Sequence, residues 1–102
     1  MKRFALALAA TLVAGTAIAA SPEDMVKSNG CLACHAIDHK VVGPAYKDVA
    51  KKYAGQKDAE AKLVAKVKAG GSGNWGQIPM PAQGHIKEAD IKAMVSYILS
   101  LK

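Results

Sequence analysis

Two thiols and an imidazole lie within five residues of one another, in the segment Cys31-Leu32-Ala33-Cys34-His35. Thiols at this spacing can form thioether bonds to both vinyl groups of one haem, and the histidine that follows can ligate its iron. The pattern C-x-x-C-H is a signal for covalent attachment of a c-type haem. We therefore predict that Cys31 and Cys34 bind haem covalently and that His35 is an axial iron ligand.

Other uses of these residues have less support. A thioredoxin-like dithiol needs a βαβ context, and nothing before Cys31 resembles a strand. A structural zinc site needs four ligands, but the chain has two cysteines, and His39 and His85 show no metal-ligand spacing. A disulfide can form in an oxidising compartment but gives His35 no role. A redox or metal-binding module without haem stays open as an alternative.

The residue at the sixth coordination position of the iron decides its chemistry, and a methionine thioether raises the reduction potential. Beyond residue 20 the candidates are Met25, Met80 and Met94. Met25 and Met94 fall on predicted helices at apolar positions, where packing is the ordinary explanation. Met80 lies between Pro79 and Pro81, which stiffen the backbone on both sides. We predict Met80 as the second axial ligand.

Two other histidines are rival ligands. His39 lies four residues beyond His35, too near to reach the opposite face of the haem, and His85 follows Met80 on the same loop. We expect both to be exposed to solvent.

An iron with both axial positions occupied does not readily bind oxygen or peroxide, and its oxidation state changes with little rearrangement. We therefore expect a one-electron carrier rather than an enzyme. The competing hypothesis is a gas-binding or peroxidatic haem protein, in which Met80 is displaced with ease or is not a ligand.

The first twenty residues have the pattern of a secretory signal peptide. Lys2 and Arg3 precede an apolar run over residues 4–14 and an A-x-A motif at Ala17-Ile18-Ala19. The apolar run is too short to span a bilayer comfortably, and no second run follows. We expect cleavage after Ala19 or after the next residue, and a periplasmic location for the remaining chain.

Residues 21–102 would form one domain of 82 residues. A chain of this size buries a modest core and is often reinforced by a metal, a disulfide or a cofactor. Loss of Lys2 and Arg3 leaves 12 basic residues against 8 acidic ones, a net charge of +4. This charge suits steering toward an acidic docking surface, and the sequence contains no nucleic-acid-binding motif.

The mature sequence predicts an all-α protein with about four helices separated by glycine- and proline-rich loops. The expected elements are a first helix from Ser21-Pro22 to Asn29-Gly30, a second from Pro44 to Gly55, a third capped by Asp58 and ended by Gly70-Gly71, and a last helix over residues 87–101. No stretch alternates long enough to indicate a sheet. The irregular segment 70–84 is long enough to be functional or mobile.

Taken together, these motifs resemble the small bacterial class I cytochromes c, in particular the cytochrome c-551 type. The segments that carry the resemblance are Cys31–Ile37, then Val42–Ala50 with its G-P-A-Y motif, then Trp75–Pro81 with the motif W-G-Q-I-P-M-P, and the C-terminal amphipathic helix. They cover nearly all of residues 21–102. The resemblance implies a compact helical fold wrapped around one covalently bound haem c.

The resemblance also implies roles around the haem. The carbonyl of Pro44 would accept a hydrogen bond from the ligating histidine, and the indole N–H of Trp75 would donate to a haem propionate. Lys66 would meet a propionate, at a position where arginine is common. Gln83, at a position often occupied by asparagine, would form a hydrogen bond near the methionine ligand.

Some positions depart from the family pattern. Val26 replaces an aromatic residue of the first helix, and Tyr97 stands where tryptophan is common in the last. These two helices should still cross near Gly30, with less aromatic packing. Lys87 occupies the place of a capping serine, so the last helix should begin without a side-chain cap.

We therefore expect a periplasmic, monomeric, monohaem one-electron carrier without enzymatic activity. The resemblance implies a membrane cytochrome complex as donor, and a nitrite reductase, peroxidase or terminal oxidase as acceptor. Lysines near the exposed haem edge are candidates for orienting these partners: Lys27, Lys40, Lys47 and Lys51.

Overall fold

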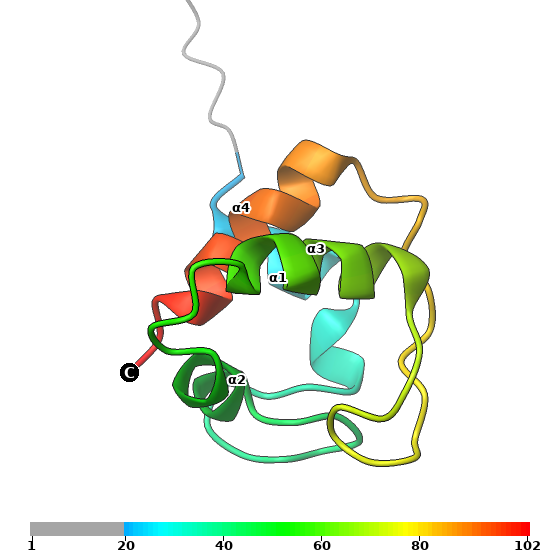
Figure 1. Ribbon diagram of the computed structural model, residues 1–102. Helices are drawn as coiled ribbons and strands as arrows, with labels where there is room; N and C mark the ends of the chain where they lie inside the picture. Colours follow the sequence, from blue (N-terminus) through cyan, green and yellow to red (C-terminus); the bar gives the residue numbers. More distant parts are fainter. Residues whose placement is uncertain (1–19) are drawn as a thin grey trace, which may run out of the picture.

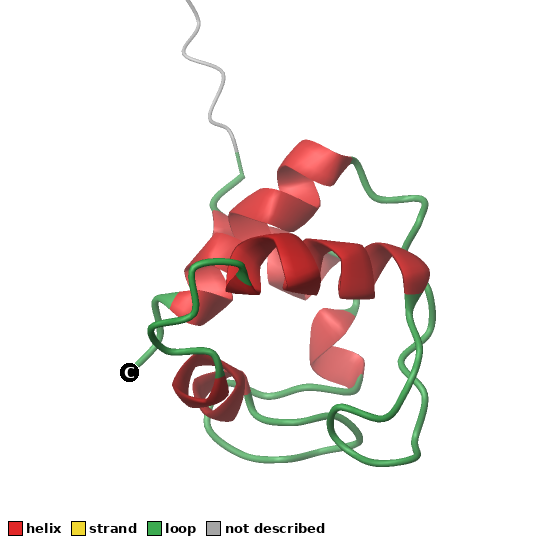
Figure 2. Ribbon diagram, viewed as in Figure 1, coloured by secondary structure: helices red, strands yellow, loops and turns green. Residues whose placement is uncertain are grey.

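The computed structural model describes residues 20–102, which form an assembly of helices around the C-terminal helix (Figure 1). The elements are α1 (Pro22–Ser28), the 3₁₀ helix η1 (Cys31–Ala33), α2 (Tyr46–Lys52), α3 (Ala59–Ala69) and α4 (Glu88–Leu99). In this part of the chain there is no β-strand, and loops make all the connections (Figure 2). The predicted all-α class is confirmed.

Except for Ala20, the expected signal peptide lies outside the described residues. Among residues 20–102, none of the helices combines the length and the apolar character that a membrane crossing needs.

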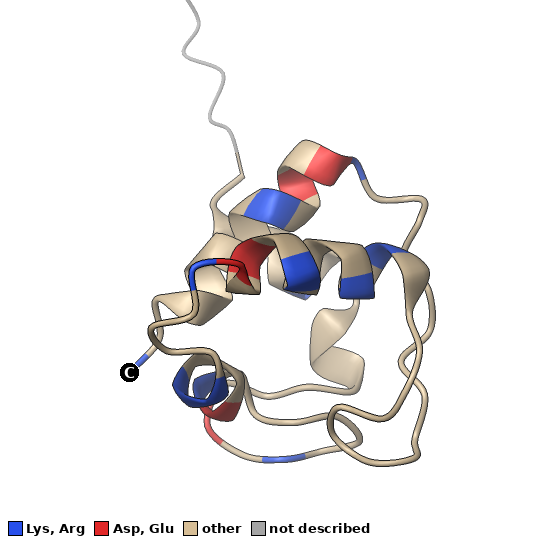
Figure 3. Cartoon of the chain, viewed as in Figure 1, with Lys and Arg blue, Asp and Glu red and all other residues tan. Residues whose placement is uncertain are grey.

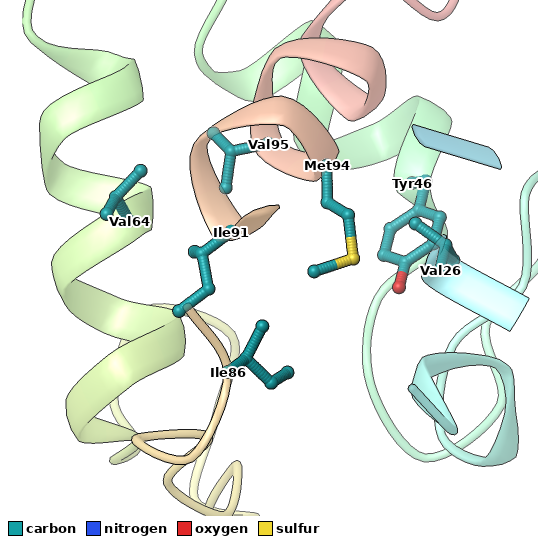
Figure 4. Packing of buried hydrophobic residues seen from close by; sticks show 7 residues of the cluster. All are labelled: Val26, Tyr46, Val64, Ile86, Ile91, Met94 and Val95. Carbon is teal, nitrogen blue, oxygen red and sulfur yellow. The ribbon is translucent and has the colours of Figure 1, made fainter. Parts of the chain in front are cut away.

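Helix α4 is central to the packing because it contacts α1, α2 and α3. Its side chains meet those of the other elements in one buried cluster, shown in Figure 4, whose members are Val26, Tyr46, Val64, Ile86, Ile91, Met94 and Val95. Ile91 has no exposed surface. A smaller cluster of Val49, Tyr53 and Ala59 joins the end of α2 to the start of α3. Each of α1, α2 and α3 therefore contributes at least one buried side chain to a core that α4 organises.

Helix α1 leads the chain directly into the C-x-x-C-H motif. The Ser21 hydroxyl accepts a hydrogen bond from the Asp24 N–H at 3.2 Å, and such a cap contributes about 1 kcal/mol to helix stability. The helix ends at Asn29, and Gly30 then adopts a φ of 74°, which only glycine tolerates without strain. The first helix therefore stops at Asn29-Gly30, as the sequence predicts, and the turn leads into η1, which contains Cys31 and is followed by Cys34.

The start of α2 differs from the prediction. The helix begins at Tyr46 rather than at Pro44, because Ala45 is extended, with φ −60° and ψ 141°. The first N–H groups of the helix bond back to the two residues that follow the C-x-x-C-H motif: Tyr46 N–H donates to the Ala36 carbonyl at 2.9 Å, and Lys47 N–H donates to the Ile37 carbonyl at 3.0 Å.

The ends of α3 and α4 also differ in detail. Asp58 occupies the N-cap position of α3 but makes no capping hydrogen bond, since its backbone, with φ −96° and ψ 4°, lacks the extended conformation typical of a capping residue. Its carboxylate pairs with Lys62 at 3.0 Å. The prediction that Asp58 caps this helix is therefore wrong. At Lys87 the expected absence of a side-chain cap on α4 is confirmed. Helix α4 ends at Leu99, before the expected limit at residue 101.

Helices α1 and α4 cross as expected, without an aromatic residue in α1. Val26 is 3 % exposed and packs against α4. The Asn29 amide nitrogen lies 4.0 Å from the Met94 sulfur, next to this crossing. Tyr97 is half-buried at the edge of the same cluster. A valine thus suffices to close this helix pair.

The substitution Ile91→Ala should lower the free energy of unfolding by about 2–5 kcal/mol, because it removes a fully buried side chain and leaves a cavity. Guanidinium unfolding of the haem-loaded protein, followed by far-UV circular dichroism, measures this change. Val41→Ala is the control, since Val41 is 47 % exposed and its truncation should cost less than about 0.5 kcal/mol. Equal losses in the two variants would contradict the packing described here.

Candidate haem-binding site

The side chains predicted to bind haem and iron line a single cavity of about 260 Å³. Cys31, Cys34 and His35 reach it from η1 and the residues that follow, and Met80 reaches it from the long loop after α3. Much of the wall is apolar and comes from α1, α3 and α4: Val26, Leu63, Val67, Ile91, Met94, Val95 and Ile98. The fold thus collects two thiols, an imidazole and a thioether around one largely apolar space.

The His35 ring is held from three sides. Its Nδ1–H donates a hydrogen bond to the Pro44 carbonyl at 2.8 Å, so the other ring nitrogen, Nε2, keeps its lone pair for a metal. The Tyr46 ring stacks on the imidazole with a centroid distance of 5.0 Å and an angle of 20°. Gly43 packs so closely that a methyl group there would lie 2.5 Å from the His35 Cε1 atom. The ring therefore has one well-defined orientation.

Backbone hydrogen bonds fold residues 41–47 onto the C-x-x-C-H motif. The Cys34 carbonyl accepts from the N–H groups of Val42 at 3.1 Å and Gly43 at 2.7 Å. Pro44 is thereby placed next to the imidazole, and the hydrogen bond that the family resemblance implies for its carbonyl is present.

Cys31 and Cys34 are half-buried free thiols. Burial raises the pKa of the Cys31 thiol and outweighs the opposing hydrogen bond with Tyr46. Burial also raises the pKa of the Tyr46 phenol. Both groups therefore stay protonated at neutral pH and bring no charge to the apolar cavity.

Met80 is fixed by its backbone. Its N–H donates to the Gly71 carbonyl at 2.8 Å, and its own carbonyl accepts from the Gly71 N–H at 3.0 Å. Of the other two methionines, Met25 packs at the edge of the core, whereas Met94 is buried and also reaches the cavity wall. The sequence predicts the burial of Met94 but not its position at the cavity.

The rival histidines lie away from the cavity. His39 and His85 are both exposed, as predicted, and neither lines this space. The His39 Nδ1 atom lies 2.9 Å from the Asp38 carboxylate, and this hydrogen bond lowers the pKa of Asp38. No group of three His, Cys, Asp or Glu side chains that could hold a metal ion occurs within residues 20–102.

The remaining predicted haem contacts differ in position. Lys66 and Trp75 line the cavity, Lys66 from α3 and Trp75 from the loop. Gln83 does not line it, and its amide nitrogen lies 3.4 Å from the Pro81 carbonyl. The propionate contacts of Lys66 and Trp75 and the hydrogen bond of Gln83 near the methionine ligand stay predictions.

Lys52 has a structural role that the sequence did not indicate. Its ammonium group donates a hydrogen bond to the Asn74 carbonyl at 2.7 Å and lies 4.4 Å from the centre of the Trp75 ring. These contacts tie α2 to the tip of the loop that carries Met80. The neighbouring Lys51 carries the same charge and lies on the same helix. The sequence alone therefore does not show which of the two lysines contacts the loop.

The chemistry of the donor set fits a c-type haem. Two thiols can form thioether bonds, while an imidazole nitrogen and a thioether sulfur can serve as axial ligands. The cavity wall behind these groups is apolar, as the porphyrin requires, and Lys66 offers a cation for its acidic side chains.

The substitution Lys52→Met should loosen the loop tip, since an exposed cation–π contact and a hydrogen bond together contribute about 1 kcal/mol. Chymotrypsin cleavage after Trp75 should become about fivefold faster, the factor that corresponds to this free energy. Lys51→Met removes the same charge one residue away and should leave the cleavage rate unchanged. Equal acceleration in both variants would show that charge, not the contact, controls the loop.

The comparisons with known proteins agree with this chemistry. The sequence matches the family model described as Cytochrome c over residues 20–102. It is 52 % identical over 98 residues to cytochrome c-551 of Allochromatium vinosum, covering 94 % of this chain and 100 % of that protein. It is 50 % identical over 102 residues to cytochrome c-552 of Hydrogenobacter thermophilus, covering 100 % of both.

The crystal structure of cytochrome c552 from Nitrosomonas europaea matches with a TM-score of 0.75 and 52 % identity, covering 78 % of this chain and 99 % of that one. The predicted resemblance to the cytochrome c-551 type is confirmed. The chain belongs to the cytochrome c family, as a small monohaem class I cytochrome c that binds one covalent haem c and carries electrons.

Proposed function

We propose that this cytochrome is a periplasmic one-electron carrier whose iron is ligated by His35 and Met80 and whose haem is attached through Cys31 and Cys34. One observation carries the proposal: both axial candidates and both thiols line the same apolar cavity, although Met80 is more than forty residues away in sequence. When bound, the haem supplies a one-electron ferric–ferrous couple.

The protein's own residues prepare the site for that couple. The Pro44 carbonyl holds the proton of His35 at Nδ1 and increases the basicity of the ring as a ligand. Tyr46 fixes the plane of the ring by stacking. Side chains of α4 such as Ile91 exclude water from the space behind the haem. The site therefore favours fixed ligation over ligand exchange, as outer-sphere electron transfer requires.

The absence of enzymatic activity belongs to the same proposal. A catalyst at the iron needs an open or easily opened sixth position. Met80 is held by two backbone hydrogen bonds to Gly71 and by the stiffness of Pro79 and Pro81. These restraints support a closed iron rather than a gas-binding or peroxidatic one.

Exposed apolar side chains surround the haem motif and support a contact face for redox partners. They are Leu32, Val41 and Val42. Among the lysines proposed to orient partners, Lys40 and Lys51 are exposed, Lys47 is half-buried, and Lys27 lies 3.7 Å from Glu23. Basic residues are spread over several helices with acidic ones between them (Figure 3). The charge that orients an acidic partner would therefore come from the lysines near the contact face rather than from a surface of one sign.

The partners that we propose are a membrane cytochrome complex as donor and a nitrite reductase, peroxidase or terminal oxidase as acceptor, each met by a monomer. The periplasmic location rests on the signal-peptide pattern of residues 1–20.

The intact mass of the protein isolated from the periplasm should equal that of residues 20–102 or 21–102 plus one haem. The double variant Cys31→Ser/Cys34→Ser should lose the covalent haem, whereas each single variant should keep it through one thioether bond. A periplasmic protein without the haem mass would contradict the attachment, and one that keeps residues 1–19 would contradict the cleavage.

The substitution Met80→Leu should abolish the far-red methionine–iron absorption band of the oxidised protein and make carbon monoxide bind rapidly to the reduced form. The reduction potential should fall by at least about 60 mV, which corresponds to a tenfold weaker preference for reduced iron. Met25→Leu and Met94→Leu are matched controls, since the exchange conserves volume, and both should keep the band.

If Met94→Leu instead of Met80→Leu abolishes the band, the assignment of the axial ligand is wrong. If the wild-type protein lacks the band at neutral pH, or its reduced form binds carbon monoxide rapidly, the carrier proposal gives way to the gas-binding alternative.

A further inference from the structure

We propose that Gly70 is a positioning residue for the Met80 ligand. Because Gly70 has no side chain, the backbone that carries Met80 can lie directly against the end of α3. This inference rests on the proposed ligation of the iron by Met80 and concerns how the protein places that sulfur.

The end of α3 and the returning loop are joined at three points. Gly71 and Met80 exchange two backbone hydrogen bonds, of 3.0 and 2.8 Å. Three residues further along the loop, the Gln83 N–H donates to the Val67 carbonyl at 2.9 Å. Met80 is therefore positioned by the end of a helix rather than by its own loop.

Gly70 ends α3 in a conformation that suits glycine, with φ 69° and ψ −161°, and its N–H donates to the Lys66 carbonyl at 2.7 Å. A methyl group on Gly70 would lie 2.7 Å from the Ala82 nitrogen and 3.0 Å from the Pro81 carbonyl carbon. It would lie closer still to the Met80 carbonyl oxygen. All three are backbone atoms, so no change of side-chain rotamer can relieve the contact.

If a methyl group is added at Gly70, the loop that carries Met80 should move rather than helix α3. Helix α3 is packed against α4 through Val64, which is buried, and through Leu63 and Val67. The loop from Gly71 to Pro79 is exposed along its whole length. A methyl group at Gly70 should therefore push Met80 away from the helix end and shift its sulfur relative to the His35 side of the cavity.

Gly55 provides a control for the cost of a positive φ alone. Its φ of 77° is close to the 69° of Gly70, so an alanine would meet a positive φ at either position. Gly70 differs in having a ψ of −161°, in a region essentially restricted to glycine. A methyl group on Gly55 would meet no atom within 4 Å. A difference between Gly70→Ala and Gly55→Ala therefore reports what is particular to Gly70, namely the close contact with the Met80 segment and the backbone conformation that allows it, and not a positive φ as such.

The test compares haem-loaded wild type, Gly70→Ala, Gly55→Ala and Met80→Leu. We expect Gly70→Ala to lose at least half of the far-red methionine–iron band. Its reduced form should bind carbon monoxide at least tenfold faster than wild type, and its potential should lie between those of wild type and Met80→Leu. Gly55→Ala should match the wild type in band, carbon monoxide binding and potential, even if it unfolds more easily.

The outcomes separate this inference from the proposed function. A wild-type protein without the band overturns the ligation by Met80, and the role of Gly70 falls with it. If wild type shows the band, Met80→Leu loses it, and Gly70→Ala keeps it in full, the role of Gly70 alone is wrong. A loss of the band in Gly55→Ala equal to that in Gly70→Ala also overturns it, because an alanine at a positive φ would then explain both.

Hydrogen exchange on the wild-type reduced protein tests the same contact if Gly70→Ala yields no haem-loaded protein. The amide protons of Gly71 and Met80 should be protected at least tenfold relative to an unstructured chain. Exchange of either amide at the unprotected rate would show that the bridge does not hold Met80 and would overturn the proposal.

Discussion

The hydrogen bond from His35 to the Pro44 carbonyl is the contact on which the geometry of the haem site depends. It exists because α2 begins late. In a helix that began at Pro44, this carbonyl would accept the N–H of Asp48, four residues on. Instead Asp48 donates to Ala45 at 3.1 Å, and the Pro44 carbonyl is left for the imidazole. A shift of two residues in a helix boundary thus fixes the tautomer of His35, the proposed iron ligand.

The two sides of the cavity are built by different means. On the histidine side, residues 31–46 are one short segment of the chain, and backbone hydrogen bonds within this segment fold it around the His35 ring. On the methionine side, Met80 reaches the cavity from a distant loop whose position depends on α3 and on the contact of Lys52 with Asn74. Local geometry secures the first side, whereas tertiary packing must secure the second.

This difference explains how much the sequence could predict. The C-x-x-C-H motif, the stiff Pro79-Met80-Pro81 segment and the helical periodicity are local signals, and the elements that they indicate are present. The late start of α2 was not predicted, because it depends on N–H groups that bond to the carbonyls of a preceding segment. The cap at Asp58 is predicted wrongly because residue type alone does not show that the backbone of Asp58 departs from the extended conformation of a capping residue.

Long-range contacts leave still weaker traces in sequence. Lys52 differs from Lys51 only by its direction on α2, and Trp75, its partner, is more than twenty residues away. Met94 occupies an apolar helical position that reads as ordinary core, and whether such a position also faces the cavity depends on how α4 crosses its neighbours. The roles of Lys52 and Met94 both depend on how the helices and the loop are arranged in space, and the periodicity of the sequence does not show that arrangement.

The same arrangement couples the core to the cofactor. Ile91, Met94 and Val95 belong to the central cluster and also line the cavity, so a haem bound there would share one set of packing contacts with the helices. Thioether bonds from Cys31 and Cys34 would keep the haem in place even while an axial bond is broken. Loss of the Met80 bond would then be a local event within a folded protein. With Met80 as the proposed ligand, the placement of the loop against α3 would therefore set the chemistry of the iron without deciding whether the haem stays bound.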